Sequence, residues 1–88
     1  MGHVLARLRG VKREVIGAVL HGDAAEHAGH GLYLEHLWQS ADEPDEVVFL
    51  FRADDIAHAR KYIEGLHTRA RAENPRVNLP QMTYLSNT

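Results

Sequence analysis

The chain contains no cysteine among its 88 residues. This absence excludes disulfide bonds, thiolate nucleophiles and cysteine-ligated metal sites. A long apolar run is also missing, so we expect no membrane-spanning segment. The first twenty residues carry too many charged side chains for a signal peptide. We therefore expect a cytoplasmic protein that has no membrane partner.

An excess of charge of one sign is missing too. Ten Lys and Arg residues oppose twelve Asp and Glu residues, which gives a net charge of -2. Because nucleic-acid-binding surfaces are strongly basic, we expect no nucleic-acid partner. The sequence lacks a Gly-rich phosphate loop, a Gly-x-Ser-x-Gly motif and the zinc motif H-E-x-x-H. It therefore points to no particular cofactor and leaves open whether the protein is an enzyme.

The composition that remains is typical of a folded globular domain. Hydrophobic residues make up 44% of the chain and charged residues 25%, which argues against disorder. The length allows one domain, so residues 1–88 are predicted to form a single folding unit.

Hydrophobic periodicity predicts six main elements. In chain order they are a strand at His3–Arg9, a helix at Lys12–Ala28, strands at Leu32–Gln39 and Glu46–Arg52, a helix from Asp54-Asp55 to Asn74-Pro75, and a strand at Gln81–Leu85. Glycines weaken the first helix, and Asp23 can begin a separate short helix at Ala24–His27. Asp54 is predicted to cap the last helix.

Apolar stripes predict which helix faces are buried. The predicted buried positions are Val15, Ile16, Val19 and Leu20 in the first helix, and Ile56, Ala59, Ile63, Leu66 and Ala70 in the last. His58 and His67 lie outside the second stripe, so both are expected on the helix surface.

The order strand, helix, strand, strand, helix, strand is the split βαβ pattern, which is called ferredoxin-like. It predicts an α+β domain with a four-stranded antiparallel sheet and both helices on one face. The run Val47–Phe51 is apolar without alternation, which favours a strand covered on both faces. Such a strand is central in the sheet, or it is covered by a partner subunit.

Two segments give the chain a resemblance to a known superfamily. One is the acidic, proline-containing hairpin Trp38–Val47. The other is Phe49–Arg60, where an apolar strand precedes an Asp-Asp helix start and an Ala-Arg pair. Over about residues 32–64 the chain resembles the small dimeric α/β-barrel proteins. That resemblance implies a homodimer in which two ferredoxin-like sheets face each other to form a barrel. Relatives include antibiotic-biosynthesis monooxygenases, heme-degrading proteins and lactone isomerases, so it also implies a cofactor-independent monooxygenase or isomerase as one possible activity.

A candidate ligand site follows from the expected register of the hairpin. If Gln39 lies opposite Val47, then residues 34, 36 and 38 share the open face of the sheet with residues 48, 50 and 52. On this face we predict that His36 is a catalytic acid or base and that His3, Arg7, Trp38 and Arg52 bind a small organic ligand in a cleft. The alternative is that the face is entirely subunit interface, in a non-enzymatic interaction or regulatory module.

A metal site is a further alternative. His27, His30 and His36 form the pattern H-x2-H-x5-H, with Glu26 and Glu35 beside them, and imidazole and carboxylate groups ligate divalent metals. Because this spacing matches no standard metal motif, the leading prediction includes no metal. The metal alternative requires the three imidazoles to converge on one point.

Overall fold

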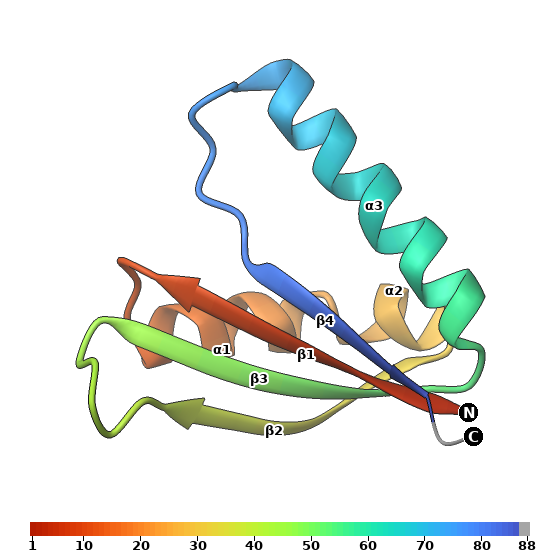
Figure 1. Ribbon diagram of the computed structural model, residues 1–88, viewed down its shortest axis with the longest axis horizontal. Helices are drawn as coiled ribbons and strands as arrows, with labels where there is room; N and C mark the ends of the chain where they lie inside the picture. Colours follow the sequence, from red (N-terminus) through yellow and green to blue (C-terminus); the bar gives the residue numbers. More distant parts are fainter. Residues whose placement is uncertain (87–88) are drawn as a thin grey trace.

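The computed structural model describes residues 1–86 and contains one four-stranded antiparallel sheet and three helices (Figure 1). The elements are β1 (Gly2–Arg9), α1 (Arg13–Gly22), α2 (Ala24–Gly29), β2 (Leu32–Gln39), β3 (Glu46–Ala53), α3 (Ile56–Glu73) and β4 (Gln81–Ser86). The predicted strands and last helix are confirmed to within two residues at each end. None of the helices within these residues is long and apolar enough to cross a membrane.

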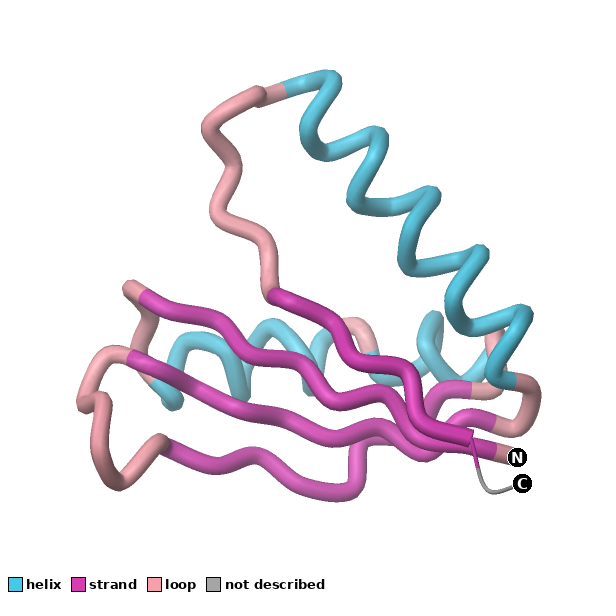
Figure 2. Tube along the Cα trace, in the orientation of Figure 1, coloured by secondary structure: helices cyan, strands magenta, loops and turns pink. Residues whose placement is uncertain are grey.

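The strands follow the spatial order β2-β3-β1-β4, and all neighbouring pairs are antiparallel (Figure 2). β1 therefore lies between β3 and β4, while β2 and β4 form the two edges. The predicted hairpin register is confirmed, because Gln39 pairs with Val47. β3 is an inner strand, as its apolar run indicates.

One face of the sheet forms the core with the helices. Alternate residues of β1 and β3 point to this face, as the period of two requires. They pack with Leu20 of α1 and with Ala59 and Ile63 of α3. All three helices therefore cover the same side of the sheet. The buried hydrophobic strand residues of this core are Val4, Ala6, Leu8, Leu32, Val47, Phe49, Phe51 and Ala53.

β2 contains a bulge that moves one predicted residue to the other face. Leu34 pairs with Phe51 and His36 pairs with Leu50, so two steps along β2 correspond to one step along β3. An extra residue in one strand shifts its alternation by one, so the residues before the bulge point to the opposite face from that expected for an unbroken strand. Leu34 consequently points to the helix side, and its predicted place on the open face is wrong.

The first helical segment is two helices separated at Asp23, so the predicted short helix after this residue is confirmed. The predicted stripe is wrong in part, because of its four residues only Leu20 is buried. Val15 and Val19 are more than half exposed. In Figure 1, α3 diverges from the sheet along its length.

The residue that caps α3 is Asp55, not the predicted Asp54. Its carboxylate accepts hydrogen bonds from the backbone N–H groups of Ala57, at 3.0 Å, and His58, at 3.2 Å. Asp54 instead accepts a hydrogen bond from Arg52 over 2.9 Å. Both aspartates have the right chemistry for a cap, and only the residue immediately before the first helical turn can reach its free N–H groups.

Removing this cap is expected to destabilise the protein. Asp55→Ala should lower the free energy of unfolding by about 1 kcal/mol, because two backbone donors lose their acceptor. The matched variant Asp54→Ala removes only an exposed ion pair and should cost between about 0 and 1 kcal/mol. Urea unfolding followed by circular dichroism measures both values. An equal cost for the two variants would contradict the assignment of the cap.

Candidate functional site

The open face of the sheet, opposite the helices, brings together the five residues predicted to act on a ligand. Antiparallel partners share a face, and His3 pairs with Arg52 while His36 pairs with Leu50. The predicted placement on this face is confirmed for all five, and their function stays a prediction. They are His3, Arg7, His36, Trp38 and Arg52.

A carboxylate at the bulge organises one end of this face. Glu35 lies 3.2 Å from the Nε2 atom of His3 and 3.9 Å from the Nε atom of Arg52. Arg52 also contacts Asp54, at 2.9 Å, and its guanidinium lies 4.5 Å from the centre of the Tyr33 ring. Arg52 is therefore held by two carboxylates and one aromatic ring, which leaves little of it free for an anionic ligand.

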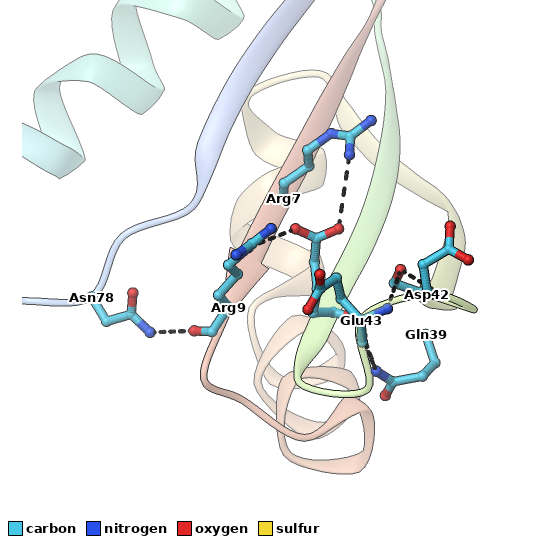
Figure 3. Close-up of polar contacts among 8 residues, drawn as sticks. Arg7, Arg9, Gln39, Asp42, Glu43 and Asn78 are labelled. Atoms are coloured by element: carbon cyan, nitrogen blue, oxygen red, sulfur yellow. Dashed lines mark hydrogen bonds and ion pairs between the residues drawn. The ribbon is translucent and has the colours of Figure 1, made fainter.

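A second ion cluster occupies the other end of the face. Glu46 is only 8% exposed, and its carboxylate lies 3.1 Å from Arg9 and 3.8 Å from Arg7. Both arginines belong to the same strand, β1 (Figure 3). The amide of Gln39 donates to carbonyl oxygens in the adjacent hairpin, among them that of Glu46 at 2.9 Å. Arg7, like Arg52, already has an acidic partner.

The middle of the open face is apolar and partly exposed. Leu5, Val48 and Leu50 are half-buried there, and the rings of His36 and Trp38 stack with their centres 4.7 Å apart. Four well-formed cavities of residues 1–86 are lined by other residues, and none of these four includes any of the five predicted residues.

A cavity of about 330 Å³ lies instead on the other side of the sheet, between the sheet and the helices. We call it the helix–sheet cavity. Most of its lining residues are apolar, and only a few have polar side chains. Its lining residues are Leu8, Ile16, Val19, Leu20, Asp23, His27, Leu32, Phe49, Phe51, Tyr62, Ile63, Leu66, His67, Leu79, Pro80 and Met82.

α3 diverges from the sheet along its length, and the loop after α3 leads back to the sheet at β4 (Figure 1). That loop is anchored, because the side-chain amide of Asn78 donates to the backbone carbonyl of Arg9 over 2.7 Å (Figure 3). Leu79 and Pro80, the next residues, line the cavity.

A more polar cavity of about 500 Å³ adjoins the first, and we call it the polar mouth. It lies between α3 and β4, and His67, Pro80 and Met82 line both cavities. Its other lining residues are Glu64, Thr68, Arg71, Gln81 and Tyr84.

His67 was expected on the helix surface, but it lies where the two cavities meet. Burial, reinforced by the positive charge of Arg71, lowers the pKa of His67 below its ordinary value. The imidazole is therefore mainly neutral at neutral pH, so one ring nitrogen donates a hydrogen bond and the other accepts one. The sequence contained no distinctive signal for this place, because α3 carries polar residues along most of its surface.

The three histidines of the metal alternative do not converge. His36 stacks on Trp38 on the open face, whereas His27 contacts Phe51 on the helix side. His30 stacks on Tyr62, with ring centres 3.7 Å apart, and its Nδ1 atom lies 3.1 Å from Nε2 of His58. Across residues 1–86, no three His, Asp or Glu side chains are placed to hold one metal ion.

The sequence matches no protein-family model, and no curated protein is detectably similar to it. The function is therefore inferred from the two cavities and the open face.

Proposed function

We propose that this protein binds a small apolar organic molecule in the helix–sheet cavity. Small-molecule sites are concave, mostly apolar and about 300–1,000 Å³ in volume. The cavity of about 330 Å³ has core side chains for most of its walls. The single observation that carries the proposal is this apolar lining, interrupted by a few groups such as His27, Tyr62 and His67 that can orient a ligand.

We infer that the domain has the ferredoxin-like arrangement. The order of the strands supports this inference, because β3 lies between β1 and β2, and β1 lies between β3 and β4. Each helical connection therefore joins two strands across one intervening strand, which is what a split βαβ unit requires. The additional short helix α2 extends the first connection.

We also propose that two copies of the chain pair through their open sheet faces, as the resemblance to dimeric α/β barrels implies. Trp38 and Leu85 are nearly half exposed at the two edges of that face, with half-buried aliphatic residues between them. The charged groups on the face already pair within the protomer. A second copy can therefore cover the face without burying uncompensated charge.

A cleft on the open face is the second candidate for the ligand site. It is favoured by the stacked pair His36 and Trp38 and by the His3–Glu35 contact, which place one imidazole beside an aromatic ring and another beside a carboxylate. None of the four cavities described above lies there, and in this proposal the second copy completes the cleft. An enzyme of the monooxygenase or isomerase type would use His36 in this cleft for proton transfer.

Binding of the neutral fluorescent probe N-phenyl-1-naphthylamine tests the leading proposal. We expect the wild-type protein to bind one probe per protomer with increased fluorescence, because the probe becomes brighter in an apolar environment. Leu66→Trp places an indole inside the cavity and should abolish binding. The matched variant Ala72→Trp adds the same indole to an exposed position on α3 that lines none of the cavities, and should bind as the wild type does.

Circular dichroism confirms in each case that the variant is folded. If Leu66→Trp binds the probe as well as Ala72→Trp does, the helix–sheet cavity is not the site. If His36→Ala abolishes binding and Leu66→Trp does not, the cleft on the open face is the site instead.

A further inference from the structure

The helix–sheet cavity opens into surroundings of a different chemistry. Its walls are apolar, whereas the adjoining polar mouth presents a guanidinium, a hydroxyl and an amide. His67, Pro80 and Met82 belong to both linings, so one molecule can extend from the first cavity into the second. A ligand that fills both would have an apolar body and one polar end.

The polar mouth has one cationic side chain, that of Arg71, among its hydrogen-bonding residues. Thr68 and Arg71 come from one side of α3, since residues three apart on a helix are neighbours. Gln81 faces them from the start of β4. Arg71 alone offers five N–H donors in a planar fork that matches a carboxylate. Such a set favours a ligand end that accepts hydrogen bonds.

Arg71 is available for such a ligand. Within residues 1–86 no carboxylate lies within ion-pair distance of its guanidinium. This contrasts with Arg7, Arg9 and Arg52, each of which has an acidic partner. The one acidic residue of the mouth is Glu64, which lies two helical turns from Arg71, or about 10 Å along the axis.

The C-terminal end of α3 disfavours binding of an anion in the polar mouth. Arg71 lies in the last turn of the helix, where the free carbonyl groups give the helix end a partial negative charge. Without the arginine, the mouth would therefore favour a neutral group over a carboxylate. The preference of the site for charge depends on this single side chain.

We propose that the ligand of the helix–sheet cavity is a monocarboxylic acid, whose apolar body fills the cavity and whose carboxylate binds Arg71 in the polar mouth. This inference rests on the proposed function, because it names the class of molecule that the same site takes. His67, at the junction, is placed to contact the ligand next to its carboxylate.

Competition by two isosteric compounds against the fluorescent probe tests the inference. Phenylbutyrate and phenylbutanamide have the same apolar body and differ in the charge of one end. Each is titrated against the protein loaded with N-phenyl-1-naphthylamine. We expect the acid to displace this probe at about fivefold to tenfold lower concentration than the amide does, a ratio between that of an exposed ion pair and that of a hydrogen bond to a charged group.

Arg71→Gln keeps a polar side chain and removes the charge. It should weaken binding of the acid by about the same factor, fivefold to tenfold, and leave binding of the amide unchanged. The matched variant Arg69→Gln removes an exposed arginine of the same helix that lines neither cavity, and should retain the preference for the acid. The acid, but not the amide, should also raise the pKa of His67 measured by proton NMR.

Each outcome separates this inference from the proposed function. If the acid has no advantage over the amide, or if Arg71→Gln and Arg69→Gln behave alike, the carboxylate assignment is overturned while the cavity remains a binding site. The carboxylate assignment is overturned as well if neither isostere displaces the fluorescent probe. If the fluorescent probe itself does not bind, the proposed function fails first.

Discussion

Replacing Leu50 by arginine is expected to convert the protein from a dimer to a monomer. Leu50 lies on β3 near the middle of the open face, where it pairs with Leu5 of β1 and His36 of β2. In the proposed dimer this position is covered by the second copy. Because a twofold interface contains each residue twice, one substitution buries two uncompensated guanidinium groups.

The expected effect is large. An uncompensated buried charge costs about 3–5 kcal/mol, so dimer affinity should fall by a factor of about a hundred or more. Within one protomer Leu50 is only half-buried, and a long arginine side chain can extend into solvent there. The variant should therefore fold as a monomer and not unfold.

Light scattering coupled to gel filtration measures the mass directly. The wild-type protein should have a mass near twice 9.9 kDa at micromolar concentration, and Leu50→Arg a mass near 9.9 kDa. Val15→Arg provides the control, since Val15 is more than half exposed on α1, away from the open face. A monomeric wild-type protein would contradict the proposed dimer and weaken the resemblance to dimeric barrels. A dimeric Leu50→Arg would place the interface on another surface.

Much of the fold follows from periodicity along the chain. The alternation of β1 indicates which of its residues face the helices, the apolar run indicates that β3 is an inner strand, and the register at Gln39 and Val47 agrees with the structure. These features are local, since they depend on which neighbours in sequence are apolar. Ranges and faces of the strands could therefore be predicted from residue types alone.

The bulge in β2 could not be placed by alternation. The apolar residues Leu32, Leu34 and Leu37 are spaced by two and then by three, with the polar pair Glu35 and His36 inside the longer step. A bulge absorbs such an extra residue and returns the strand to its earlier alternation. The break in spacing was the available signal, and the prediction that residues 34, 36 and 38 share one face overlooked it.

The helix–sheet cavity could not be predicted because it depends on the angle between α3 and the sheet. A helical stripe shows which side of α3 is apolar, and Ile56, Ala59 and Ile63 do point to the core side as predicted. The stripe contains no information on where the helix leaves the sheet. Leu66 and His67 lie at that point and line a cavity instead of being packed solidly.

The second large effect is expected at Phe51, which lies between the sheet and this cavity. Its side chain is 5% exposed and makes edge-on ring contacts with Phe49, at 5.8 Å between ring centres, and with His27, at 5.3 Å. Phe51→Ala removes all of these contacts and enlarges an existing space. We expect a loss of about 3–5 kcal/mol in the free energy of unfolding, a large part of the roughly 5–15 kcal/mol that stabilises a small domain.

The control for this prediction is the cross-strand partner of Phe51 on the same face. Leu34 is 42% exposed, so Leu34→Ala should cost about 1 kcal/mol or less, because little of its surface leaves water on folding. Urea unfolding at one fixed protein concentration compares the variants, since dimerisation makes apparent stability depend on concentration. If Phe51→Ala does not fold, Phe51→Leu should still cost more than Leu34→Ala. An equal loss in the free energy of unfolding at the two positions would mean that Phe51 is not part of the packed core. It would also contradict the assignment of Phe51 to the lining of the helix–sheet cavity.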